Sequence, residues 1–204
     1  MTASLTDDLF NQLQGQPLAD MGHRLGLSQS QTAGAVSAAL PLLLGALGRN
    51  TSRPQGADAL FGALQRDHAG LDLGSVLGSV LGGGGQGAGI LEHVLGGRQA
   101  NAQRGLGAAT GLDEGQAGAL LKMLAPIVMA YLAKRMFAQP SSTSAAPALT
   151  PQGLGDILGQ EQTQIRQQGG LGGGLLGAVL DQDGDGDLDI NDLMRLGGSI
   201  FGSR

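Results

Sequence analysis

Apolar residues recur at helical spacing from the start of the chain. Two short apolar helix faces come before a longer one, and Gly26 directly follows the second short face. Because residues three and four positions apart share one side of a helix, this pattern predicts two short amphipathic helices, the second ending at Gly26. The first face contains Leu5, Leu9, Phe10 and Leu13, and the second contains Leu18, Met21 and Leu25.

A long helix is predicted to begin directly after these two. Ser28 followed by Gln31 forms a capping-box pattern, in which the Ser side chain accepts from a free backbone N–H and the Gln side chain reaches back. Pro41 removes one backbone donor and is expected to kink this helix. The apolar stripe continues through Val36, Leu40, Leu43, Leu44 and Leu47.

The same region is uncharged between Arg24 and Arg49, which raises the alternative of a membrane span. Its first third holds Ser28, Gln29, Ser30 and Gln31, and the remaining apolar part is near the lower limit for crossing a bilayer. A buried core helix is the better interpretation, so we expect no membrane partner.

This segment recurs further along the chain without a gap, at an offset of 85 residues. Ser28 becomes Asp113, another residue that caps helix N-termini, so the capping pattern is repeated. The shared mid-helix proline makes coincidence a poor explanation, and we interpret the pair as a duplicated helical unit. Gly26, Leu27, Gln31, Pro41 and Leu47 reappear as Gly111, Leu112, Gln116, Pro126 and Leu132.

Proline and small polar residues follow the second copy. Pro140, Pro147 and Pro151 with interleaved Ser, Thr and Ala predict a linker, and few contacts are expected to cross it. We therefore divide the chain into a helical domain at 1–138, a linker with a short apolar patch at 139–170, and a C-terminal tail at 171–204. Cutting within 140–151 is expected to leave a folded helical piece.

Two stretches of the helical region carry a family resemblance. The pattern LGLSQSQTAGAVSAALPLLLGALGRN from residue 25 and GILEHVLGG from residue 89, with the second proline-centred helix, resemble the YidB-like bacterial domain of unknown function. The resemblance covers roughly residues 5–137 and rests on core spacing. It implies an all-α, homeodomain-like fold and no established activity.

Negative charge is concentrated in the tail. The chain has 204 residues and a formal charge of -5, but the stretch DQDGDGDLDIND alone holds six aspartates, which leaves +1 for the rest. A near-neutral remainder offers neither a basic footprint for nucleic acid nor a polybasic membrane patch. A dense block of carboxylates instead calls for a cation.

The aspartates follow the ligand order of an EF-hand. Gly186 stands at position 6, where the chain must turn sharply, and oxygen-only ligands suit a hard cation such as Ca²⁺. Apolar flanks on both sides predict an EF-hand-like helix-loop-helix over 171–204. Asp181, Asp183 and Asp185 occupy positions 1, 3 and 5, Asp187 offers its carbonyl at 7, Asp189 a water-mediated contact at 9, and Asp192 stands at 12.

Position 12 departs from the common pattern. Asp192 replaces the usual Glu and is one methylene shorter, which puts bidentate coordination in doubt and resembles dockerin-type or Mg²⁺-tolerant loops. Leu188, at position 8, either packs on the helical domain or pairs with a second chain, because no second loop occurs in the sequence. The alternative is a solvated turn that binds nothing specific.

We find no catalytic motif in the sequence. The glycine run 82–89 contains G-x-G-x-x-G spacing without a preceding strand or a phosphate-binding Lys, and His23, His68 and His93 are isolated. Glu92 beside His93 lacks a nucleophile and does not face it on a helix. We therefore expect no catalytic residues, no organic cofactor site and no enzyme.

The composition narrows function without identifying a process. There is no Cys, which excludes disulfides and thiolate sites, and Met1–Phe10 lacks the pattern of a secretory signal, so a cytoplasmic location is expected. We predict a non-enzymatic interaction or scaffold module that self-associates or binds another protein. The alternative is a nucleic-acid-binding regulator, for which Arg24, Arg49 and Arg53 could contact phosphate.

Overall fold

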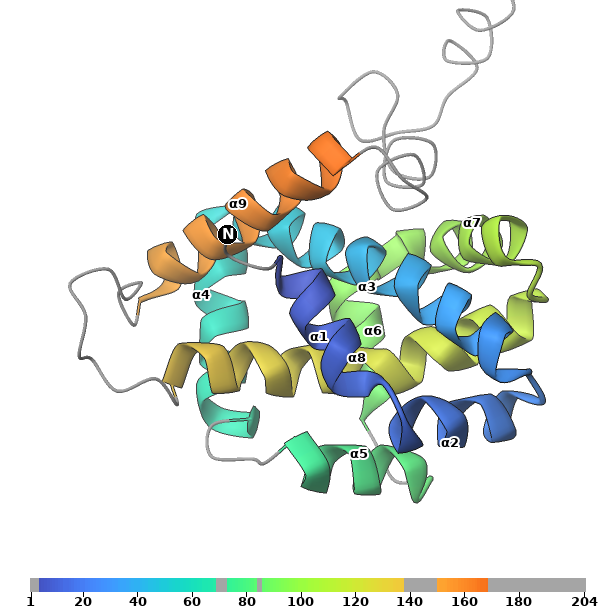
Figure 1. Ribbon diagram of the computed structural model, residues 1–204. Coiled ribbons are helices and arrows are strands. Elements are labelled where there is room, and N and C mark those ends of the chain that lie inside the picture. The colour runs from blue at the N-terminus through green and yellow to red at the C-terminus, as the bar shows by residue number, and fades with distance from the viewer. Residues whose placement is uncertain (1–3, 69–72, 84–85, 138–149, 169–204) are drawn as a thin grey trace, which may run out of the picture.

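The computed structural model describes residues 4–68, 73–83, 86–137 and 150–168, and within these ranges it contains helices and no strands (Figure 1). This confirms the all-α class. The tail 171–204 lies outside the described residues, so the predicted EF-hand-like helix-loop-helix remains a prediction. The helices are α1 (Leu5–Leu13), α2 (Gln16–Leu25), α3 (Gln29–Thr51), α4 (Pro54–Ala63), α5 (Leu73–Leu81), α6 (Gly87–Leu95), α7 (Gln99–Thr110), α8 (Glu114–Phe137) and α9 (Pro151–Gln168), with a π-helical turn at Leu64–His68 and a 3-10 turn at Gly96–Arg98.

The two long helices begin with the hydrogen bonds that the sequence predicts. At α3, the backbone N–H of Gln31 donates to Ser28 Oγ at 3.3 Å, and the Ser28 N–H donates to Gln31 Oε1 at 3.0 Å. At α8, the corresponding bonds join Asp113 and Gln116 at 2.7 and 3.3 Å. Each pair satisfies donors that a helix N-terminus leaves without a partner.

The turns that precede α3 and α8 also share their geometry. Gly26 and Gly111 end the preceding helices with φ of 67° and 74°, in the left-handed region that glycine adopts without a steric penalty. Four residues earlier, Gly22 and Gly107 lie so close to the next turn that a Cβ would come within 3.2 and 2.7 Å of a backbone carbonyl oxygen. The same local conformation therefore recurs at the 85-residue offset.

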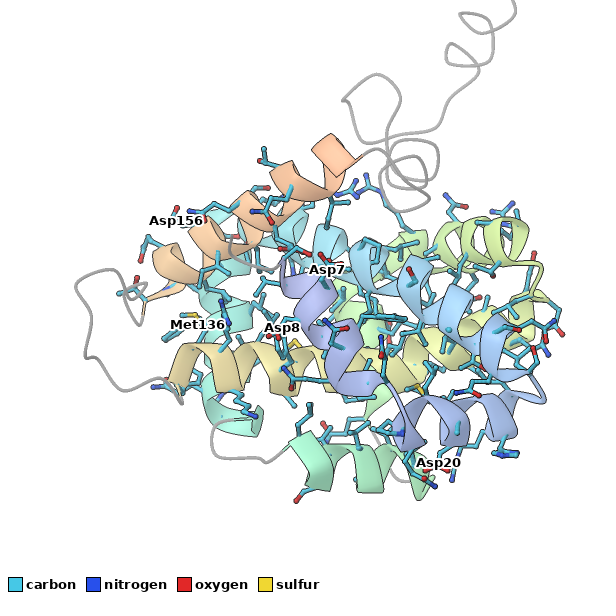
Figure 2. The ribbon with its side chains drawn as sticks, in the orientation of Figure 1. Asp7, Asp8, Asp20, Met136 and Asp156 are labelled. Atoms are coloured by element: carbon cyan, nitrogen blue, oxygen red, sulfur yellow. The ribbon has the colours of Figure 1, made fainter. Side chains whose placement is uncertain are left out.

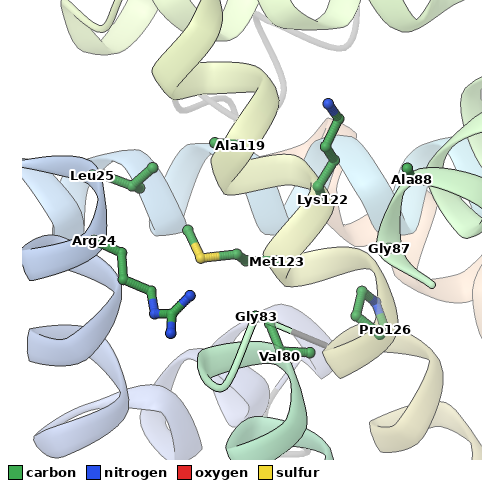
Figure 3. Close-up of a pocket in the computed structure, with 10 residues that line it drawn as sticks. All are labelled: Arg24, Leu25, Val80, Gly83, Gly87, Ala88, Ala119, Lys122, Met123 and Pro126. Atoms are coloured by element: carbon green, nitrogen blue, oxygen red, sulfur yellow. The ribbon is translucent and has the colours of Figure 1, made fainter. Parts of the chain in front are cut away.

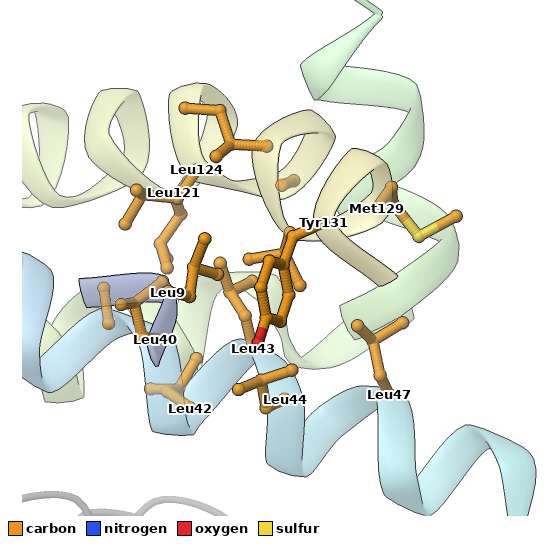
Figure 4. Packing of buried hydrophobic residues seen from close by; sticks show 14 of the residues in the cluster. Leu9, Leu40, Leu42, Leu43, Leu44, Leu47, Leu121, Leu124, Met129 and Tyr131 are labelled. Carbon is orange, nitrogen blue, oxygen red and sulfur yellow. The ribbon is translucent and has the colours of Figure 1, made fainter. Parts of the chain in front are cut away.

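α3 and α8 form the centre of the core. Both continue through their prolines, and the two helices pack against each other, with Leu43 of α3 near Tyr131 of α8 and Leu9 of α1 near Leu40 of α3 (Figure 4). By length and composition each helix could cross a membrane, but 78% of each apolar window is buried inside the chain, and a core helix passes the same test. The prediction of a buried core helix is confirmed for α3.

Residues 151–168 differ from the linker predicted at 139–170. They form α9, which packs along α3 and α4 and buries Leu154, Leu158 and Ile165 (Figure 1). Gly48 of α3 permits this approach, since a Cβ there would meet the Leu158 carbonyl oxygen at 3.2 Å. Glycines and a Gln-rich run interrupt the apolar spacing, and tertiary packing outweighs the low helix propensity of the glycines.

Candidate functional site

The predicted cation ligands lie outside the part of the chain that the structure describes. This holds for Asp181, Asp183, Asp185, Asp187, Asp189 and Asp192. Among the described residues, no group of three or more His, Asp or Glu side chains is arranged to hold a metal ion. The sequence therefore remains the basis of the cation site, and the last described helix, α9, ends before the tail begins.

Aspartates of the helical body are dispersed over several helices. Figure 2 shows Asp7 and Asp8 on α1, with Asp20 on α2 and Asp156 on α9. Ser4 Oγ donates to Asp7 Oδ2 at 2.8 Å at the start of α1. A carboxylate in the first turn of a helix is favoured by the helix dipole.

Asp8 fixes the one tyrosine of the sequence. The Tyr131 hydroxyl donates to Asp8 Oδ2 at 2.6 Å, and the Tyr131 side chain is 3% exposed. Burial raises the pKa of Tyr131 above its ordinary value, and the hydrogen bond to Asp8 and the negative charge of Asp8 raise it further. This bond attaches α1 to α8 and leaves the phenol neutral at physiological pH.

Glu161 joins the last described helix to the first. Its carboxylate accepts from the backbone N–H groups of Leu5 and Thr6 at 2.8 and 2.9 Å and from Thr6 Oγ1 at 2.6 Å, although Glu161 is 4% exposed. A buried carboxylate is tolerated where charge-assisted hydrogen bonds and a helix N-terminus compensate its desolvation. Glu161 thus caps α1 from a distant part of the chain.

Sequence reasoning missed this role, although a signal exists. Glu161 stands three residues after Leu158 and four before Ile165, on the face that α9 buries. A lone carboxylate on an apolar helix face requires a buried partner. The N-terminus of α1 offers suitable donors, but nothing local in the sequence connects the two.

Described glycines of the run 82–89 lie at the end of α5 and at the contact between α6 and α8. Gly82 and Gly83 end α5, and Gly87 lies against α8 so closely that a Cβ would overlap the backbone carbonyl of Lys122. A pocket of about 360 Å³ adjoins this region. Figure 3 shows the Arg24 guanidinium directed toward Gly83, whereas the Lys122 ammonium points the other way.

Two further pockets adjoin α6 and bring together basic residues from distant positions. Arg49, Arg53 and Arg98 line a pocket of about 260 Å³, and Arg66 lines a neighbouring one of about 440 Å³. His93 borders both, and its Nδ1 donates to the Gly89 carbonyl at 2.9 Å. No basic stripe is visible along the sequence, because these arginines come from separate helical segments.

Comparison with known proteins identifies one family model, which matches residues 7–135 and is described as bacterial protein of unknown function (DUF937). No curated protein matches the chain, and no solved structure matches it. The family match begins within α1 and ends within α8. Neither α9 nor the aspartate-rich tail is part of it.

Proposed function

Because the chain belongs to this DUF937 family of bacterial proteins of unknown function, whose description names no activity, we propose from its residues that it is a non-enzymatic interaction module with a Ca²⁺-binding C-terminal loop. The observation that carries the proposal is the attachment of α9. Glu161 and the buried face of α9 hold this helix, the last one described before the loop in the sequence, against the body. Ion binding in the tail would therefore take place C-terminal to a helix that is fixed to the helical body.

The ligand order supports Ca²⁺ as the resident ion. Asp181, Asp183 and Asp185 supply direct carboxylate ligands, and Asp187 supplies its backbone carbonyl. Asp189 contacts the ion through water. Asp192 closes the site with a shorter arm than Glu, which lowers the preference for Ca²⁺ over Mg²⁺, so Mg²⁺ is the alternative ion.

Partner binding is assigned to the tail rather than to the long helices. The apolar faces of α3 and α8 are packed within one chain, so they offer little surface for self-association. Leu188 lies at the loop position that contacts a neighbouring loop in paired EF-hands. We propose that the metal-loaded tail pairs with a second copy or binds another protein, in the cytoplasm.

The recurring turns support the finer description of the body. Both turns have a glycine in the left-handed region and a capping side chain at the following helix, which is consistent with a duplicated, homeodomain-like helical unit. The closer resemblance to YidB-like domains is part of this proposal. Nothing in that likeness assigns an activity, since one fold hosts many functions.

Isothermal titration of the full chain with Ca²⁺ and with Mg²⁺ tests the proposal. Asp181→Ala and Asp185→Ala each remove a direct ligand and are expected to abolish binding, whereas Asp192→Glu is expected to tighten Ca²⁺ binding. Asp156→Ala, on the exposed side of α9, is the matched control and should bind like the parent. If Asp181→Ala binds like the parent, the loop is a solvated turn.

A pulldown with and without Ca²⁺ then tests the interaction. The parent chain is expected to capture a partner protein only when Ca²⁺ is present, and Asp181→Ala is expected to lose this capture. Salt-dependent retention on DNA that is independent of Ca²⁺ would favour a nucleic-acid-binding regulator instead.

A further inference from the structure

Two pockets adjoin each other between α6, α4 and the C-terminal end of α3. They have Asn50, His93 and Val94 in common, so the two pockets are direct neighbours. The larger pocket has about 440 Å³ and the smaller about 260 Å³. The larger pocket alone falls within the range of sites that take small molecules, roughly 300–1,000 Å³, and the smaller lies just below it.

The smaller pocket has a basic lining. Arg49, Arg53 and Arg98 line it together with the polar side chains of Asn50 and Ser52. No Asp or Glu is among the residues that line either pocket in the described part of the chain. Guanidinium groups beside a recess can bind carboxylate or phosphate through paired hydrogen bonds.

Helix dipoles account for part of this cluster but not for all of it. Arg49 lies in the last turn of α3, where a positive charge stabilises the helix C-terminus. Arg53 is the N-cap residue of α4, and its side chain makes no capping hydrogen bond there. A cation at a helix N-terminus opposes the dipole. An anionic ligand would compensate this cost.

The larger pocket supplies an apolar surface beside the arginines. Leu60 and Met129 are buried at its wall, and Ile90 is half-buried there. Arg66 is exposed at the same pocket. The combination of an apolar chamber and a basic neighbour matches a ligand with one apolar end and one anionic end.

We propose that this double pocket binds a small amphipathic anion, with a carboxylate or phosphate head group at Arg53 and its neighbours and an aliphatic body in the chamber beside Leu60 and Met129. The site uses described helices and no residue of the aspartate-rich tail, so it is independent of Ca²⁺ binding. It adds a small-molecule ligand to an interaction module.

Titration of the full chain with four probes in a buffer free of divalent ions tests the ligand class. Octanoate and octyl phosphate carry the two head groups, octylammonium carries the opposite charge, and inorganic phosphate lacks the apolar body. At least one of the two anionic amphiphiles is expected to bind at least about tenfold more tightly than octylammonium and inorganic phosphate. The tighter of the two identifies the head group. Equal binding of octylammonium, or of inorganic phosphate, would overturn the proposal.

Two variants test the basic half and the apolar half of the site separately. Arg53→Gln is expected to weaken the anionic amphiphile at least about tenfold, because a charge-assisted contact is lost. Ala63→Leu narrows the chamber and should weaken the amphiphile without changing the response to inorganic phosphate. Arg104→Gln, on the exposed face of α7 and outside both pockets, is the control.

Thermal melting and circular dichroism of each variant establish that the fold is retained. Arg53 is exposed and its loss removes no capping bond, so Arg53→Gln should melt at the temperature of the parent or slightly above it, because a charge that opposes the dipole of α4 is gone. A folded Arg53→Gln variant that binds the amphiphile with unchanged affinity would contradict the assignment of the head group.

Discussion

Tyr131 gives a single-residue probe of the packing between α1 and α8. Its pKa is raised above the ordinary value of 10.0, first by burial and then by Asp8. The neutral phenol therefore stabilises the fold fully below about pH 10, and this contribution is lost as the pH rises toward the raised folded pKa, because the unfolded chain releases the proton first. The free energy of unfolding should fall by about 1.4 kcal/mol per pH unit there.

Urea denaturation between about pH 9 and pH 11 measures this slope. In Tyr131→Phe the free energy of unfolding should fall less steeply as the pH rises. At neutral pH this variant should be less stable than the parent by about 0.5–1.5 kcal/mol, because the hydrogen bond to Asp8 is gone. The chain has one tyrosine and no tryptophan, so absorbance reports its ionisation directly. Ionisation of Tyr131 in the folded protein at the ordinary pKa of tyrosine would contradict its buried position.

Two glycines of α6 provide a matched pair. A Cβ at Gly87 would overlap the Lys122 carbonyl, whereas a Cβ at Gly89 meets nothing within 4 Å. Gly87→Ala should lower the free energy of unfolding by about 1–3 kcal/mol through overpacking. Gly89→Ala should raise it by up to about 1 kcal/mol, because alanine favours the helix. Equal effects in thermal melting would show that α6 does not approach α8 as described.

Glu161 tests the attachment of one element to another. Glu161→Gln keeps the volume but removes the charge that three donors of Leu5 and Thr6 share, so a loss of about 1–3 kcal/mol is expected. Asp156→Asn on the exposed side of α9 should change stability by less than about 0.5 kcal/mol. Chemical denaturation of both variants decides between a buried cap and a surface contact, since a surface Glu161 would behave like Asp156.

The helices differ in how far their sequences predict them. α3 carries its own start signal at Ser28 and Gln31 and a continuous apolar stripe, so its position follows from local chemistry. α9 has comparable buried positions, but glycine and glutamine separate them, and its stability depends on contact with α3. The Glu161 cap and the arginine-lined pocket join residues from distant segments, which periodicity does not relate.

The whole molecule is expected to depend on α9. A chain ended after residue 137 loses the burial of Leu154 and Leu158 and the cap from Glu161, so its free energy of unfolding should fall by at least about 3 kcal/mol relative to a chain ended after residue 168. Urea denaturation of the two chains measures the difference. Equal stability would restore the modular division expected from the prolines.

Hydrogen exchange of the full chain, with and without Ca²⁺, tests most directly the claim that a cation-binding tail is held on a helical body by α9. We predict that Ca²⁺ slows exchange in residues 181–192, while the amides of α9 and of Leu5 and Thr6 are protected in both states. Unchanged exchange across the aspartate loop at millimolar Ca²⁺, or rapid exchange of α9 in both states, would contradict it.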